Sequence, residues 1–199
     1  LPPDAHVWCF RPTANLPISE MSPARLQWRN TKPVFSSVVH LGSNPAQFGL
    51  VMRPQSLPLK DTYSNILETE YYTINHVSES FIQKAHYTSA KLKKSESEFD
   101  RMQIEREFIG DFHAPFVKTS AVKLGMKYLE SIPLPNGCIF VIGEVVLIDF
   151  PEESINEKGQ LDLASYNCVG ISGLNTYYSL NKLATFPFVG SVEEIPSFE

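Results

Sequence analysis

The feature that most constrains the fold is a pair of apolar segments joined by a tight turn signal in the second half of the chain. In residues 121–128, apolar side chains alternate with lysine and glycine, which is the period of a half-buried strand. Asn136-Gly137 is a strong signal for a hairpin turn. Residues 138–150 are apolar on both faces, as expected for a strand between a barrel interior and another element, and Gly143 indicates a bend or bulge at a barrel corner. We therefore predict a long β-hairpin.

More strands are predicted on both sides of this hairpin. Phe35–Leu41 and Phe48–Met52 are apolar runs rich in β-branched and aromatic residues, and a Gly-Ser-Asn-Pro turn signal separates them. Tyr71–Val77 also has the composition of a strand. A last short strand is predicted within Leu161–Ile171. The strands thus outnumber the helices that can be expected.

Only a few helices are predicted. One begins at Asp61 or Thr62, whose side-chain oxygen can serve as N-cap, and runs to about Glu70. Ser78 can cap a second helix, and the charged residues 91–107 are predicted to be surface helix or loop. Many strands with a few interposed helices, not in strict alternation, favour a closed β-barrel with helical decorations over a doubly wound sheet.

The ends of the chain lack this pattern. Residues 1–33 are rich in proline and are predicted to be an arm or loop. Residues 34–190 are predicted to form the barrel domain, and residues 191–199 a C-terminal tail. With 199 residues, 43% of them hydrophobic, the chain can bury a core, and one domain is the default.

Charge and hydropathy exclude two classes of protein. The 17 Lys and Arg against 22 Asp and Glu give a net charge of −5 without a basic block, so a general nucleic-acid binder is excluded. No apolar run approaches the roughly 20 residues that a membrane span requires, so a transmembrane protein is excluded as well. The three cysteines are an odd number without a CxxC pair, and no N-glycosylation sequon is present, which favours a cytoplasmic location.

Common catalytic and metal-binding motifs are missing from the sequence. It contains neither GxxxxGK[ST] nor GxGxxG, and residues 170–173 fall one residue short of a nucleophile elbow. The five histidines are scattered without ligand spacing, so no metal site is expected. Cys138 and Cys168 fall in apolar strand segments, where thiols are usually inert.

Several residues are suited to bind a phosphate group. Ser36 and Ser37 supply hydroxyls at the start of one strand, Arg53 follows the next strand, and Lys60 lies beside the helix start at Thr62. Arginine offers a bidentate fork, the free N–H groups of a helix start favour anions, and each charge-assisted bond contributes roughly 1.5–3 kcal/mol. On the residues alone, a structural explanation is equally open: serines alternating in a strand, a solvated arginine and a threonine that only caps a helix.

Five segments keep the order and spacing of one known family between residues 30 and 189. They are Phe35–Pro54, Lys60–Val77, Ala85–Lys91, Ala114–Tyr128 and Gly137–Val146. Together they resemble the flavin reductase-like, FMN-binding split-barrel family, which includes flavoredoxins. The chain departs from the family before Asn30, where SEMSPARLQWR lacks the glycine of the usual Asp/Glu-x-Gly hairpin.

The resemblance implies a mainly β fold with helices, namely a six-stranded split β-barrel of Greek-key type. It also implies a homodimer with FMN near each end of the subunit interface. The residues that it implies for cofactor binding are Phe35, Ser36, Ser37, Val38, Arg53, Lys60, Asp61, Thr62, Asn75 and Lys91.

The resemblance also draws attention to His86 and to a pair of tyrosines. His86 is the implied catalytic position, where it could face the flavin as a proton donor or contact a nicotinamide, although a structural histidine is an equal alternative. His76, at the end of a strand, is predicted to be structural. Tyr177 and Tyr178 resemble the family's C-terminal pocket or dimer segment, and packing alone would explain them equally well.

The function implied is that of an FMN-binding flavoprotein, an NAD(P)H:flavin oxidoreductase in which NAD(P)H delivers hydride to flavin N5. FAD or riboflavin is an additional candidate as substrate. The alternative is a non-catalytic FMN electron carrier, similar to flavoredoxin, that passes electrons to a protein acceptor. A heme or pyridoxal-type ligand in a related split barrel is a third hypothesis.

Overall fold

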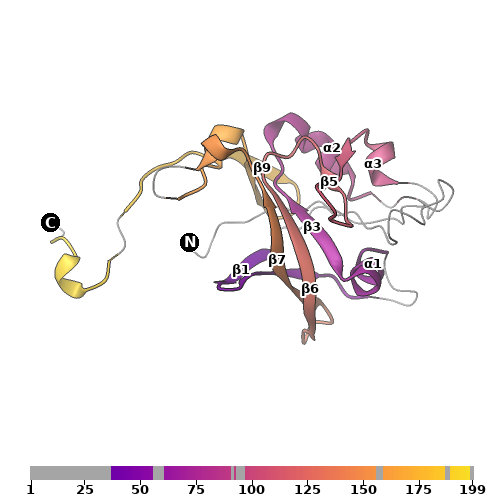
Figure 1. Cartoon of the computed structure of the whole chain (residues 1–199), viewed down its shortest axis with the longest axis horizontal. Helices are drawn as coiled ribbons and strands as arrows, with labels where there is room; N and C mark the ends of the chain where they lie inside the picture. The colour runs from indigo at the N-terminus through magenta and orange to yellow at the C-terminus, as the bar shows by residue number, and fades with distance from the viewer. Residues whose placement is uncertain are drawn as a thin grey trace.

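The computed structural model describes residues 37–55, 61–90, 92, 97–155, 159–186 and 189–197, the side chain of Asp61 excepted. Its centre is a five-stranded antiparallel sheet in the order β1-β2-β7-β6-β3 (Figure 1). These strands are β1 (Val38–Ser43), β2 (Ala46–Met52), β3 (Tyr71–Asn75), β6 (Lys123–Pro133) and β7 (Ile139–Asp149).

Within the described ranges, two small sheets and three helices accompany the main sheet. The small sheets pair β4 (Arg106–Glu107) with β5 (Phe116–Val117), and β8 (Val169–Ser172) with β9 (Thr176–Ser179). The helices are α1 (Asp61–Thr69), α2 (Ile82–Tyr87) and α3 (Glu98–Arg101), with short 3₁₀ turns at Glu79–Phe81, Glu152–Ser154, Ala164–Tyr166 and Val192–Glu194.

The long hairpin predicted from the sequence is β6–β7. Its ladder runs from the pair Lys123–Asp149 to the pair Pro133–Ile139, and Gly137 takes the positive φ of 78° that its turn requires. The register shifts between Tyr128 and Glu130, opposite Gly143, so the bulge predicted at this corner is present with its extra residue on the partner strand.

Two expectations about local structure are wrong. The first half of β6 is buried on both faces. Lys123 and Gly125 are buried like the apolar residues Leu124 and Met126 that alternate with them. Phe112 covers this second face, since a Cβ built on Gly125 would lie 2.8 Å from its ring.

Ser78 does not cap a helix through its side chain. Its hydroxyl pairs with that of Ser80 at 2.8 Å, and the α-helix begins at Ile82.

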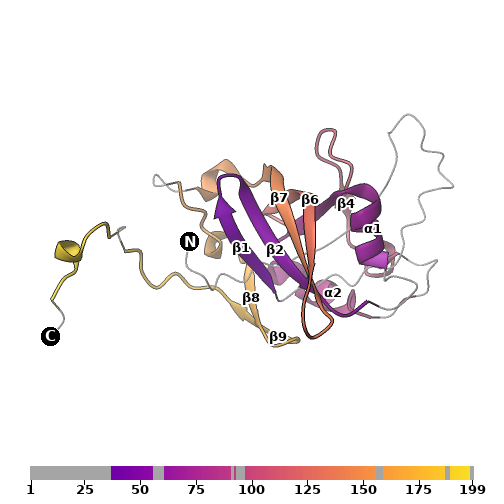
Figure 2. The same cartoon turned by 90° about the horizontal axis from the view of Figure 1, so that it is seen from below.

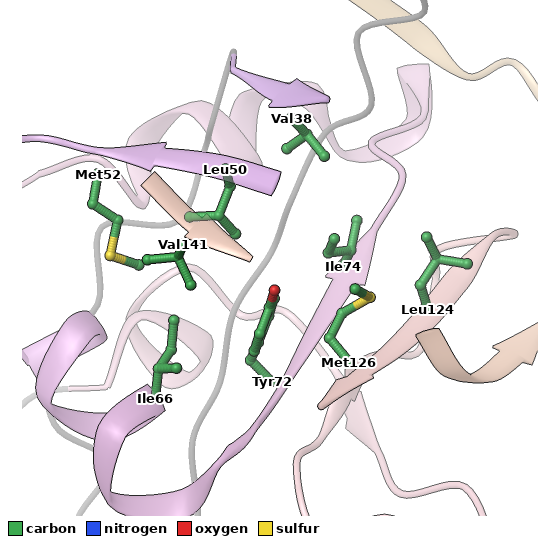
Figure 3. Packing of buried hydrophobic residues seen from close by; sticks show 9 residues of the cluster. All are labelled: Val38, Leu50, Met52, Ile66, Tyr72, Ile74, Leu124, Met126 and Val141. Atoms are coloured by element: carbon green, nitrogen blue, oxygen red, sulfur yellow. The ribbon is translucent and has the colours of Figure 1, made fainter. Parts of the chain in front are cut away.

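The main sheet wraps around one hydrophobic cluster without closing among the described residues. Figure 3 shows these side chains converging from β1, β2, β3, β6 and β7, with α1 contributing Ile66 at one end. The nine buried members are Val38, Leu50, Met52, Ile66, Tyr72, Ile74, Leu124, Met126 and Val141. The closed barrel favoured by the strand pattern is therefore a barrel that is open along one side.

A second hydrophobic cluster lies at the far end of β3. It joins Val77, Ala85 of α2, Phe99 of α3 and Val169 of β8, with Tyr177 packed against it. The backbone N–H of Val169 donates to the carbonyl of Val77 at 3.0 Å. The β8–β9 hairpin is thus attached to the end of β3.

The chain beyond β9 leaves the sheet. Both views show the described part of this segment leading away from the β-structure (Figures 1 and 2). Leu183 is 96% exposed and Phe186 83% exposed. The arm predicted for residues 1–33 lies outside the described residues. No helix in the described ranges is long and apolar enough to cross a membrane.

Candidate functional site

The first candidate group lies where β1 begins and β2 ends. The N–H of Val51 donates to the carbonyl of Ser37 at 3.2 Å, and the Ser37 hydroxyl donates to the carbonyl of Val51 at 3.4 Å. Ser37 therefore lies beside Val51 of β2, and Arg53 follows Val51 by two residues. Arg53 is exposed, and no carboxylate in the described ranges forms an ion pair with it. A hydroxyl and a cationic fork thus share one end of the β1–β2 hairpin.

Helix α1 is packed at the same end of the sheet. Ile66 belongs to the same buried cluster as Met52, the residue before Arg53 (Figure 3). Thr62 is in the first turn of α1 and is only 6% exposed. The structure therefore brings together two of the features predicted for a phosphate site, namely Ser37 and Arg53, whereas α1 is joined to this end of the sheet through Ile66.

Two predicted site residues have side chains engaged in the fold. Val38 is 3% exposed and part of the barrel core, so its side chain faces away from solvent. The amide oxygen of Asn75 accepts from the N–H of Val117 at 3.0 Å, and its amide nitrogen donates to the Thr73 hydroxyl at 3.0 Å. These bonds give Asn75 a structural role that ties β3 to β5. Cofactor contacts by the side chains of Val38 and Asn75 stay predictions without support from this geometry.

His86 lies in a second candidate group, formed by α2 and the β8–β9 hairpin. Its Nδ1 is 3.1 Å from the hydroxyl of Tyr177, and the two rings meet edge to face with centroids 5.8 Å apart. The ring of Tyr87 approaches His86 at 5.7 Å. Burial raises the pKa of Tyr177 above its usual value, which keeps the phenol protonated.

His76 is a buried histidine that has no ionic partner among the described residues. It is 6% exposed, and burial lowers its pKa to about 4, so the ring is neutral at physiological pH. Its backbone is fixed because its carbonyl accepts from the Ser120 hydroxyl at 2.8 Å. Nothing in this environment contradicts the structural role predicted for it.

The sequence does not reveal an ion cluster that forms around a buried lysine. Nζ of Lys123 is 2.7 Å from Glu107 Oε1 and 2.8 Å from Asp149 Oδ2. Burial lowers the pKa of Lys123, but hydrogen bonds to Asp149 and Glu107 outweigh this and leave it above the usual lysine value. Asp149 lies opposite Lys123 in the β6–β7 register, whereas Glu107 comes from β4, and no signal near Lys123 in the sequence could have identified it. The cluster joins the β4–β5 sheet to the main sheet.

Several predicted site residues lie outside the described part of the structure. They are Phe35, Ser36, Lys60, Lys91 and the side chain of Asp61. Among the residues that are described, no three His, Cys, Asp or Glu side chains gather in a way that could hold a metal ion.

A family model and a curated relative match this chain in sequence. The family model is described as "Flavin reductase like domain" and matches residues 29–167. An uncharacterised protein of Aquifex aeolicus (strain VF5) is 27% identical over 120 residues, which is 60% of this chain and 60% of that protein. The chain thus spans about three fifths of the length of the curated relative that it matches.

Solved structures match the fold over most of the chain. A protein from Shewanella frigidimarina NCIMB 400, an inferred flavin reductase with a split barrel domain, is 39% identical, with a TM-score of 0.80 over 92% of this chain and 86% of that one. Flavoredoxin of Desulfovibrio vulgaris (Miyazaki F) is 17% identical, with a TM-score of 0.70 over 93% and 92% of the two chains. An FMN-binding protein from Thermus thermophilus is 16% identical, with a TM-score of 0.66 over 92% and 90%. The last two show the fold alone, and the predicted split barrel is confirmed.

Proposed function

Because this chain belongs to the flavin reductase-like domain family, we propose that it is a flavin-binding oxidoreductase that holds FMN and takes electrons from NADH or NADPH. The observation that carries the proposal is the family match across residues 29–167, joined to a split barrel shared with a 39% identical structure. The cytoplasmic location expected from the cysteine pattern stays a prediction.

The phosphate of FMN fits the end of the β1–β2 hairpin that holds Ser37 and Arg53. A guanidinium without a carboxylate partner among the described residues can donate two parallel hydrogen bonds to a phosphate. The Ser37 hydroxyl, whose one hydrogen bond within the described residues is a long 3.4 Å bond to Val51, can turn to the same ligand.

The protein's own part in such a reaction is to bind and orient. FMN, when bound, supplies the ring that accepts hydride at N5 and passes electrons on. The chain would hold the phosphate at Arg53 and offer polar contacts near His86, and it needs no side-chain nucleophile. This agrees with the missing catalytic motifs in the sequence.

We propose that the functional unit is a homodimer. Register pairs place Val39 and Ile142 on one face of the sheet across Gly49, and Ile132 and Phe140 on the same face. The Phe140 ring lies over Gly49, since a Cβ built there would be 2.0 Å from it. Val39 is 46% and Ile132 41% exposed, so this outer face (Val39, Ile132, Phe140 and Ile142) offers apolar surface to a second copy.

Three measurements test the proposal: the visible spectrum of the purified chain, a fluorescence titration with FMN, and the oxidation of NADH or NADPH. The purified chain is expected to be yellow or to quench the fluorescence of added FMN, and to oxidise NADH or NADPH when FMN is present. A colourless chain that leaves FMN fluorescence unchanged would refute both binding and activity.

Stopped-flow spectroscopy separates the reductase from the electron carrier. Fast bleaching of the bound flavin by NADH or NADPH supports the reductase. A bound flavin that stays oxidised with both nucleotides, but is bleached by dithionite, supports the carrier.

A further inference from the structure

The chain after β9 repeats a large apolar side chain at every third position. The residues between are polar or small, except Pro187 and Phe188. A polyproline-type extended chain and a 3₁₀ turn both have three residues per turn, so both place every third side chain on one face. This segment can therefore present one continuous apolar edge, which we call the apolar stripe: Leu180, Leu183, Phe186, Val189, Val192 and Ile195.

The described residues of the chain itself do not bury the apolar stripe. All six side chains are exposed, Leu183 and Phe186 almost completely, and none belongs to either hydrophobic cluster of the described residues. Leu180, at the start, lies against β8, since a Cβ built on Gly170 would be 3.3 Å from its Cδ2. Beyond it, the described segment leads away from the β-structure (Figures 1 and 2). Segments that stay free in water are poor in large apolar residues, so this stripe is typical of a contact surface.

The outer face of the main sheet has dimensions that suit the apolar stripe. It crosses the four neighbouring strands β1, β2, β7 and β6, which at a spacing of about 4.8 Å extend over roughly 15 Å. An extended chain that rises about 3.1 Å per residue spans about 28 Å from Leu183 to Val192. The segment is thus long enough to cross the outer face of a second copy and to bridge the space between two copies.

The area needed for a stable dimer also requires more than the outer face. A specific interface buries about 800 Å² on each partner. The four side chains of the outer face are partly covered, and they offer roughly 200 Å². Each side chain of the apolar stripe offers on the order of 100 Å². The stripe and the outer face of one copy together come to about the area that one partner contributes.

We propose that the apolar stripe of each copy packs on the outer face of the other copy, so that the dimer is held by exchanged C-terminal segments. Two-fold symmetry then gives every outer face one stripe and every stripe one outer face. The proposal rests on the homodimer of the proposed function and names the surfaces that join its copies.

The first test removes the apolar character of the stripe. In Leu183→Ser with Phe186→Ser, the dissociation constant of the dimer is expected to rise about 100-fold or more in sedimentation. The far-UV spectrum should stay that of the parent chain, because neither side chain packs in a cluster of the described residues. The control is Leu67→Ser with Phe108→Ser, two exposed apolar side chains of the same chain, and its dimer should match the parent dimer.

The second test mixes this stripe variant with a face variant, Val39→Glu with Ile132→Glu. Each variant alone is expected to be monomeric, because both contacts of its dimer are damaged. A mixed dimer keeps one intact contact, formed by the stripe of the face variant on the outer face of the stripe variant. Mixing the two monomeric variants should therefore restore dimers of intermediate affinity. Dimers joined face to face, or stripes folded onto their own sheet, would not be restored in this way.

Three results would overturn the proposal. They are a stripe variant as dimeric as the parent chain, a face variant that stays dimeric, and two monomeric variants that fail to restore dimers when mixed. A monomeric parent chain would contradict the homodimer as well. None of these measurements needs a flavin, so a chain that dimerises as expected but binds no FMN contradicts the proposed flavin chemistry alone.

Discussion

The phenol oxygen of Tyr72 occupies the space that a Cβ on residue 143 would take, because a Cβ built on Gly143 would lie 2.2 Å from it. Tyr72 is fully buried and cannot turn aside, and the carbonyl of Lys127 is 3.0 Å from the same point. Gly143→Ala is therefore expected to destabilise the fold by about 1–3 kcal/mol in urea unfolding. Tyr72→Phe in the same chain should recover part of that loss. Equal stability of Gly143→Ala and the parent chain would contradict this packing.

Lys123 should matter far more to stability than Lys118, although both have a carboxylate at 2.7 Å. Lys123→Met leaves the carboxylates of Glu107 and Asp149, which are 32% and 41% exposed, without a lysine that is only 10% exposed, and we expect a loss of about 1–3 kcal/mol. Lys118 is 57% exposed, and Lys118→Met should leave stability nearly unchanged. Equal losses in chemical unfolding would refute the distinction.

His76 should make stability depend on pH in the acidic range. The folded chain keeps the imidazole neutral down to about pH 4, whereas the unfolded chain takes up a proton near pH 6.5. Stability is therefore complete above pH 6.5 and falls by up to about 3 kcal/mol as the pH drops from 6.5 to 4. His76→Gln should remove this slope from the unfolding curves. Replacing the exposed His113 by Gln should leave the slope in place.

Arg53 should distinguish FMN from riboflavin, which has the same ring but no phosphate. Arg53→Met is expected to weaken FMN binding about 10- to 100-fold by loss of a charge-assisted bond, and to leave riboflavin binding unchanged. Arg101→Met, at an exposed arginine of α3, is the control. Fluorescence titration measures both ligands, and an equal loss for the two would place Arg53 away from the phosphate.

The outer face should determine whether two copies of the chain form a dimer. The parent chain is expected to elute with twice its monomer mass of 22.4 kDa in light scattering, and Val39→Glu with Ile132→Glu to shift it to the monomer. Phe108→Glu is the control, because that side chain is 51% exposed but lies outside the main sheet. A dimer that survives both charges would show that another surface joins the copies.

The sequence specified those parts of the fold that depend on neighbours in the chain. The β6–β7 hairpin was predictable because Asn136-Gly137 fixes a turn locally and the apolar runs beside it set the register. The juxtaposition of Ser37 and Arg53 follows from the β1–β2 hairpin in the same way.

Contacts between distant segments were beyond such reasoning. The alternating pattern predicts a solvent face for Lys123. Asp149 lies opposite it in the β6–β7 register, but Glu107 comes from β4 in a separate sheet, which no local pattern encodes. The pairing of His86 with Tyr177 depends on where the β8–β9 hairpin docks, which no local pattern encodes.

Strand β3 enters both hydrophobic clusters, since Tyr72 and Ile74 belong to the barrel core and Val77, just beyond the strand, to the cluster under α2. Neither cluster can come apart while this shared backbone stays in place. Heating should consequently unfold both clusters in a single calorimetric transition. A destabilising substitution near either candidate group would therefore lower the unfolding temperature of the other group as well.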